Sequence, residues 1–208
     1  LRKAYAGFLG GPGLEVVRAF QQAKVPEPTY FETLELARAA ARSSLDAKVV
    51  EVAVGPLDPG TAKLLLAERV ARTGDDKSAV ALLVEGFGLA RASVWVDKRA
   101  LLQALALVRE IVGRSTWAAD PLLAALETPF VLHMEDMARH RVAIWLSSRA
   151  QNATCAAVSG DPRGFPWEQK ALEERVACLT RVGSPALPAA QADLGRFVRQ
   201  APTPVGGR

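Results

Sequence analysis

The chain has 208 residues, of which half are hydrophobic and only 6% are aromatic. A chain of this length fits one large domain or two small ones and can bury a sizeable core. The net charge of +4 is small, and the basic residues neither gather in one segment nor alternate with aromatic residues. We therefore expect no nucleic acid partner. No apolar run reaches the roughly 18–20 residues of a membrane-spanning helix, so we expect no transmembrane segment.

Ala, Leu and Val supply most of the apolar residues, and Ala and Leu with Arg, Glu and Gln favour helices. The composition therefore predicts an all-α fold, an irregular bundle of about eight helices with short connections that contain Pro or Gly. We expect a single helical domain over residues 1–200, with a subdivision near residues 115–130 as the alternative, and a flexible tail over residues 201–208. No repeat of fixed period is present, so the sequence does not favour a solenoid of tandem repeats.

The first quarter of the chain is predicted to contain two helices. A glycine-rich turn at residues 10–13 precedes the first helix, over residues 14–23. Pro26 ends this helix, because proline lacks an amide hydrogen and clashes inside a helix. Thr29 is placed to cap the second helix, which is expected to reach about residue 44.

Residues 48–54 are the one segment with a strand-like pattern. They alternate valine with other residues, which indicates a strand, although a helix that enters from Leu45 fits equally well. A helix is then predicted to start at Thr61 and to end at Gly74.

The middle of the chain is predicted to contain a long helix that Asp76 caps and a second one that Asp97 caps. The second is the most regular, with an apolar face that includes Leu101, Leu102 and Leu105. A short helix over residues 122–126 follows, and the C-terminal part is expected to form three helices over residues 131–152, 167–182 and 189–200.

Cys155 and Cys178 are the only two cysteines, and each lies at the edge of or within a predicted helix, with a loop rich in Gly and Pro between them. They are either two buried free thiols or a disulfide between the two helices. A disulfide that closes a loop of this size would contribute about 3 kcal/mol to stability. We favour the disulfide, which would place the protein outside a reducing cytosol, in the periplasm or the extracellular space.

Trp145 and Arg149 precede Cys155, and the run Ala177-Cys178-Leu179-Thr180 surrounds the second cysteine. Residues 140–180 resemble the C-terminal part of the LprI-type periplasmic lysozyme-inhibitor domain, in which a helix with Trp, Arg and Cys precedes a second Cys-containing helix. The N-terminal half of that family's pattern, with its own cysteine and an acidic Asn-Tyr motif, is not found upstream. The resemblance implies a helical hairpin and an extracytoplasmic compartment, and it does not extend to lysozyme inhibition.

His133 and His140 are the only histidines, and Asp136 lies between them on one predicted helix. Such a set resembles the ligands of a zinc site. The seven-residue spacing, however, separates the two imidazoles by about 10 Å along the helix axis, whereas helical ligand pairs are usually four residues apart. We therefore expect two histidines at the boundary of the apolar face, and neither a metal nor another cofactor.

The sequence contains no nucleophile motif and no phosphate-binding loop, so we expect no enzyme. The favoured hypothesis is a non-catalytic helical module that binds a protein partner or acts as a scaffold outside the cytosol. The alternative is an accessory structural subunit of a larger complex, and a metal-binding protein or enzyme at the His133/His140 helix is less favoured. The expected anchors for a partner are aromatic residues in or beside loops: Trp95, Trp117, Phe165 and Trp167.

Overall fold

The computed structural model describes residues 30–42, 50–51, 54–93, 96–131, 133–150 and 165–200. These residues form eight α-helices and one 3-10 turn, and they contain no strand, which confirms the all-α prediction. The helices are α3 (Tyr30–Arg42), α5 (Pro59–Arg72), α6 (Asp76–Ala92), α7 (Lys98–Arg114), α8 (Ala119–Leu126), α9 (His133–Ser147), α11 (Gln169–Arg181) and α12 (Leu187–Gln200), with η1 (Thr116–Ala118) before α8. The predicted helix over residues 14–23, the tail, Trp95 and Cys155 lie outside the described residues.

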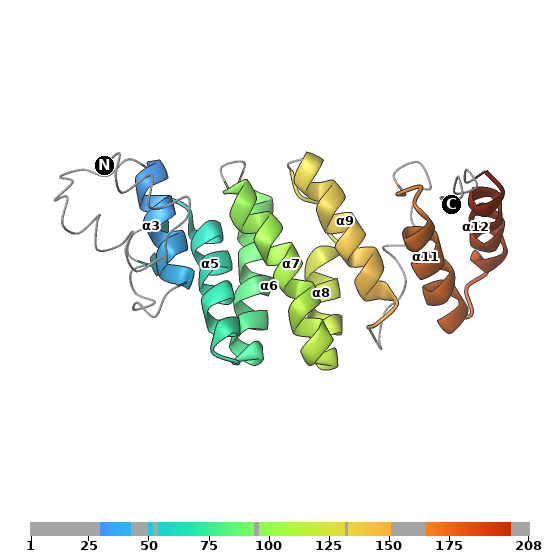
Figure 1. Ribbon diagram of the computed structural model, residues 1–208, viewed down its shortest axis with the longest axis horizontal. Helices are drawn as coiled ribbons and strands as arrows, with labels where there is room; N and C mark the ends of the chain where they lie inside the picture. Colours follow the sequence, from blue (N-terminus) through green and yellow to red (C-terminus); the bar gives the residue numbers. More distant parts are fainter. Residues whose placement is uncertain are drawn as a thin grey trace, which may run out of the picture.

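The helices follow one another along the long axis of the molecule, from α3 at one end to α12 at the other (Figure 1). One layer consists of α5, α7, α9 and α11, each in contact with the next, and α6 contacts α8 in a second layer. Each helix thus packs on near neighbours in the chain, as in stacked helical arrays. Such stacking needs matching apolar faces and not equal helix lengths, so it forms here without a fixed sequence period.

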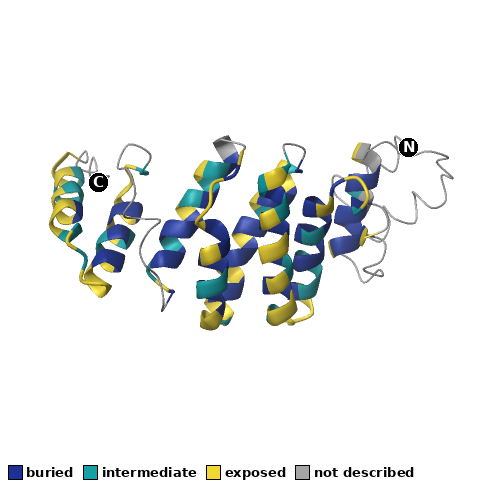
Figure 2. Cartoon of the chain, turned by 180° about the vertical axis from the view of Figure 1, so that it is seen from behind, coloured by how far each residue is buried: buried dark blue, intermediate teal, exposed yellow. Residues whose placement is uncertain are grey.

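Two clusters of buried side chains run through this row. The larger cluster joins α5 to α9 and extends to Cys178 and Leu179 on α11. The smaller cluster joins α3 to α5 and includes Ala100 on α7. Burial decreases towards the C-terminal end of the row, where Ala190 is the buried residue of α12 (Figure 2).

The segment with the strand-like pattern is helical at its described positions, Val50, Glu51 and Val54. The N–H of Gly55 donates to the carbonyl oxygen of Glu51 at 3.0 Å, as in a helical turn. Val50 and Val54 are both fully buried, whereas Glu51 is exposed. Positions four apart share one face of a helix, so both valines reach the core in this conformation.

Aspartates start three helices: Asp97 at a predicted position, Asp75 next to one, and Asp58 three residues before the predicted start at Thr61. Asp58 accepts a hydrogen bond from the N–H of Thr61 at 3.0 Å, so α5 begins at Pro59 and not at Thr61 as expected. Proline is favoured there because the first helical N–H needs no partner within the helix. Asp97 accepts from the N–H of Ala100 at 2.7 Å, which confirms the predicted cap of α7.

The predicted cap of α6 by Asp76 is wrong. Asp75 caps the helix and accepts from the N–H of Ser78 at 3.0 Å. Asp76 instead accepts hydrogen bonds from Arg114 at 2.8 Å and from the hydroxyl of Ser115 at 2.7 Å, at the end of α7. The start of α6 is thereby tied to the end of α7.

A chain of buried polar groups connects α3 with the starts of α5 and α7. The guanidinium of Arg38, which is almost fully buried, donates to the carboxylate of Asp97. The backbone N–H of Asp97 donates to the hydroxyl oxygen of Thr61 at 2.9 Å, and that hydroxyl donates to Asp58. Buried polar groups are stable only when they are hydrogen-bonded, so this network has a structural role at the junction of the three helices.

Candidate functional site

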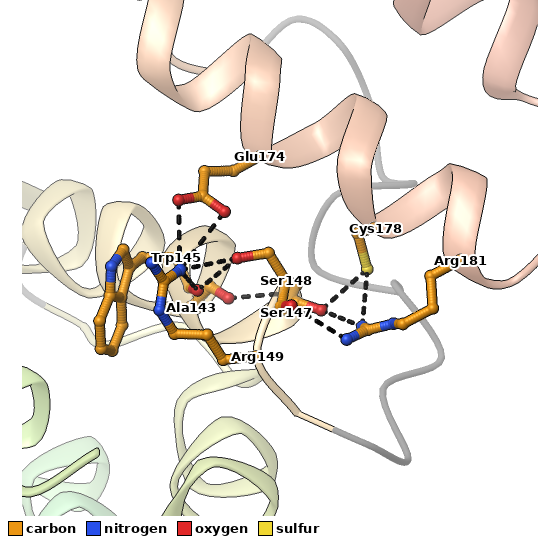
Figure 3. A network of polar contacts seen from close by, with 8 residues as sticks. All are labelled: Ala143, Trp145, Ser147, Ser148, Arg149, Glu174, Cys178 and Arg181. Carbon is orange, nitrogen blue, oxygen red and sulfur yellow. Dashed lines mark hydrogen bonds and ion pairs between the residues drawn. The ribbon is translucent and has the colours of Figure 1, made fainter. Parts of the chain in front are cut away.

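The C-terminal end of α9 is held by two arginines (Figure 3). Arg181 on α11 donates to the carbonyl oxygens of Ser147 and Ser148, and the second distance is 3.1 Å. Arg149 donates to the carbonyl oxygen of Trp145 at 2.9 Å. Cationic side chains satisfy the last carbonyl groups of a helix and compensate its dipole, so α9 ends at Ser147, before the expected end at residue 152.

Cys178 lies on the side of α11 that faces this helix end (Figure 3). Its side chain is fully buried, and its Sγ atom lies 3.1 Å from the carbonyl oxygen of Ser147. Cys155 lies outside the described residues, so the pairing of the two cysteines stays a prediction.

Trp145 lies on α9, near the end of that helix that contacts α11, and it also faces the neighbouring helix α7. The guanidinium carbon of Arg149 is 4.1 Å from the centre of the indole ring, and that of Arg109 on α7 is 5.8 Å from it. Both distances fit cation–π contacts. Arg149 also pairs with Glu174 on α11 at 3.2 Å. The half-buried indole is therefore held in place by Arg149, just after the end of α9, and by Arg109 on α7, and α11 contributes through Glu174.

Trp145 lines a cavity of about 270 Å³ where α7, α9 and the start of α11 meet. Its charged lining residues are Arg109, Arg141, Glu168, Lys170 and Glu174. Glu168 pairs with Arg141 at 2.5 Å, and Glu174 pairs with Arg149, so both carboxylates are neutralised. Within the described part of the chain, Arg109 and Lys170 form no ion pair, and both are exposed. Among the described residues, the cavity consequently presents two positive charges that have no ion-pair partner.

A second cavity, of about 360 Å³, lies between α7 and α9 and is mainly apolar. Its apolar lining comes from Leu102, Leu105 and Ala106 on α7 and from Ala138 and Val142 on α9. Arg109 and Arg141 line this cavity and the first one alike, so the two cavities adjoin at these side chains. We call the two together the α7/α9/α11 groove.

A third cavity, of about 460 Å³, lies between α5 and α7 and shares Ala106 with the groove. Glu68, Arg72, Glu110 and Arg114 give it charges of both signs. All three cavities therefore lie on the layer of α5, α7, α9 and α11. The second and third cavities share the small side chain of Ala106 on α7.

Of the aromatic residues that the sequence suggested as anchors, Trp95 lies outside the described residues, and Trp117, Phe165 and Trp167 are not among the residues that line this groove. Trp117 lies in η1 and is 51% exposed, and Trp167 is 47% exposed and stacks edge-on with Phe197 on α12, at 6.2 Å. Phe165 packs against the core beside His140, with the ring centres 5.9 Å apart. No contact among the described residues brings Trp117 together with the other two. Each remains a candidate anchor by itself.

The histidine helix places its acidic residues against arginine and lysine. Asp136 accepts hydrogen bonds from Arg139 and, at 2.7 Å, from the N–H of Phe130. Burial by itself would raise the pKa of Asp136, but the hydrogen bonds and the positive charge of Arg139 hold it below its ordinary value. His140 packs on Phe165, and the side chain of His133 lies outside the described part. The described residues contain no group of three or more His, Cys, Asp or Glu side chains that could hold a metal ion.

No motif in the sequence indicates the groove. The helical periodicity predicts that Leu102 belongs to the apolar face of α7 together with Leu101 and Leu105, but Leu102 is 45% exposed. The buried positions of α7 run through Leu101, Leu105 and Val108, and Leu102 lies beside that stripe. An apolar residue one position off a helical stripe, on the same face as Arg109, is the signal that could have indicated this surface.

No family model matches this chain, and neither the curated proteins nor the solved structures contain a significant match to it. Nothing in these comparisons bears on the resemblance of residues 140–180 to the lysozyme-inhibitor domain, which stays a prediction. None of the described helices is long and apolar enough to cross a membrane.

Proposed function

We propose that this protein is a non-catalytic helical module that binds a protein partner in the α7/α9/α11 groove. The observation that carries this proposal is Trp145, which lines the groove while the guanidinium groups of Arg109 and Arg149 hold its ring. Tryptophan and arginine dominate the energetics of protein interfaces, and an anchor that is already fixed loses little entropy on binding.

The shape of the site supports a protein segment as the partner. The groove joins an apolar cavity to a polar one and draws its residues from three helices of one layer. Layers of stacked helices form extended surfaces that suit partners longer than a small ligand. Leu102 adds an exposed apolar side chain at one end, and a segment that covers it would remove that surface from water.

We further propose that Cys155 and Cys178 form a disulfide and that the protein acts in the periplasm or outside the cell. Cys155 follows Ala150 by five residues, and five residues span at most about 17 Å. The Cys178 sulfur lies beside Ser147, close to the point where that segment leaves α9. The bridge would fix α11 to the end of α9 and thereby stabilise the wall of the groove.

A selection from a random peptide display library tests the proposed function. Binders to the wild-type protein should protect α7, α9 and α11 in hydrogen-exchange mass spectrometry. Ala106→Trp fills the groove at its small exposed residue and should abolish the binding of the selected peptides. The matched control is Ala124→Trp, at an exposed position of α8 in the second layer, which should bind like the wild type. Peptides that protect only other helices, or that bind Ala106→Trp normally, would contradict the proposal.

An accessory subunit of a larger assembly is the second candidate, and the C-terminal end of the row supports it. Val198 on α12 is 56% exposed, and Trp167 and Val182 are also partly open to solvent. An end of this kind fits a surface that a neighbouring subunit covers. A partner that copurifies stoichiometrically with the wild type would test this function. Loss of that partner with Val198→Asp, together with its normal copurification with Ala106→Trp, would support this function over the first.

A further inference from the structure

We infer that the partner segment is an acidic peptide whose carboxylates bind at Arg109 and Lys170 while its aliphatic side chains fill the cavity between α7 and α9. This inference rests on the proposed function and specifies the chemistry of the partner. Its basis is that the groove combines two uncompensated cations with a neighbouring apolar cavity.

The net positive charge of the polar cavity favours a negatively charged ligand. Its lining has three cations, Arg109, Arg141 and Lys170, against two carboxylates. The carboxylate of Glu168 is taken by Arg141 and that of Glu174 by Arg149. A basic ligand would have to break one of these ion pairs, whereas an acidic ligand can use Arg109 and Lys170 as they stand. Complementary charge at an interface determines specificity and the rate of encounter.

Trp145 strengthens the preference for a carboxylate at Arg109. The guanidinium of Arg109 lies 5.8 Å from the indole ring, and the ring provides a surface that orients a planar guanidinium. An oriented guanidinium can bind a carboxylate through two parallel hydrogen bonds. Lys170, at the start of α11, lines the same cavity and provides a second positive charge on a flexible side chain.

The apolar cavity determines which side chains neighbour the acidic residues in the partner segment. Leu102, Ala106 and Val142 provide an aliphatic lining without an aromatic ring. Side chains such as leucine or valine gain free energy when such a surface is removed from water. Since Arg109 and Arg141 border both cavities, a segment with neighbouring aliphatic and acidic residues can occupy the two at once.

Three synthetic peptides of equal length test this inference. Each has about ten residues, enough for roughly 33 Å of extended chain, and is built from leucine and glycine with either glutamate, glutamine or lysine. Fluorescence anisotropy should show that the glutamate peptide binds the wild-type protein at least about tenfold more tightly than the glutamine peptide and that added salt weakens its binding. The lysine peptide should bind more weakly than both.

The double variant Arg109→Glu/Lys170→Glu should reverse this order and prefer the lysine peptide. The control Lys77→Glu/Arg199→Glu changes the net charge equally at exposed positions of α6 and α12 and should keep the wild-type order. Thermal unfolding establishes that both variants are folded. A glutamate preference that survives the Arg109/Lys170 reversal, or that the control abolishes, overturns the inference. Display-selected peptides that bind in the groove but are neutral or basic overturn the acidic partner and leave the proposed function intact, whereas the absence of any binding in the groove overturns both.

Discussion

Arg181 on α11 reaches across to the end of α9, where its Nη1 atom lies 3.1 Å from the carbonyl oxygen of Ser148. The same side chain donates to the carbonyl oxygen of Ser147. One side chain thus satisfies two terminal carbonyl groups of a neighbouring helix and connects α11 to α9.

Replacement of Arg181 by methionine should lower the free energy of unfolding by about 1 kcal/mol, because two helix-end carbonyl groups lose a charged donor. Urea unfolding followed by circular dichroism measures the change. Arg199→Met, at an exposed position of α12, is the matched control and should stay within about 0.5 kcal/mol of the wild type. Equal stability of the two variants would show that the hydrogen bonds of Arg181 to the end of α9 contribute nothing to the free energy of unfolding.

Gly86→Ala and Gly88→Ala should have opposite effects on stability. A Cβ atom at Gly86 would lie 2.7 Å from a terminal methyl of Leu64, where α5 packs against α6, so Gly86→Ala should cost about 1–3 kcal/mol. A Cβ at Gly88 would meet nothing within 4 Å, and alanine there should stabilise the helix by about 0.5–1 kcal/mol. Thermal unfolding of the two variants measures both changes. A stabilising Gly86→Ala would show that Leu64 can move aside and that the two helices do not require a glycine.

Asp136→Asn should destabilise the protein at neutral pH and much less in acid. The folded-state pKa of Asp136 lies below its ordinary value of 3.8, so the ionised carboxylate stabilises the fold. That contribution is complete well above pH 3.8 and is lost as the pH falls through the still lower folded pKa. Asparagine keeps one acceptor oxygen but loses the negative charge and one acceptor for Arg139, which should cost about 1–2 kcal/mol at pH 7.

Urea unfolding of the wild type and Asp136→Asn at neutral and acid pH measures this difference. Glu51→Gln removes an exposed carboxylate and serves as the control, with little change at either pH. A destabilisation by Asp136→Asn that is equally large in acid would mean that the charge of Asp136 is not what stabilises the turn before α9.

The proposed bridge between Cys155 and Cys178 can be tested by mass spectrometry of the intact, non-reduced protein after alkylation under denaturing conditions. No adduct before reduction and two adducts after it would establish the bridge, because these are the only two cysteines. Two adducts without reduction would mean free thiols. The extracytoplasmic proposal would then lose its main support, and a subunit of an intracellular assembly would become the stronger candidate.

The sequence by itself determined the all-α class and the approximate places of most of the described helices. Its Ala- and Leu-rich composition required helices, and aspartates such as Asp97 fixed where they begin, because capping depends on residues only three positions away. The predicted cap of α6 was one residue off, because the adjacent carboxylates of Asp75 and Asp76 are equivalent in the sequence. Asp76 bonds to Arg114 and Ser115 at the end of α7, which leaves Asp75 as the cap. At Val50 and Val54 it left helix and strand open, and burial against α3 and α5 decided for the helix.

Tertiary structure alone decided the groove. Arg109, Trp145 and Lys170 come from three helices and have no common pattern in the sequence, so only the packing of α7, α9 and α11 brings them together. The exposure of Leu102 was decided in the same way, since a leucine's position on a helix face follows from the sequence but whether a neighbour covers that face does not. Helix formation depends on nearby residues, whereas a binding surface depends on which faces the packed helices leave uncovered.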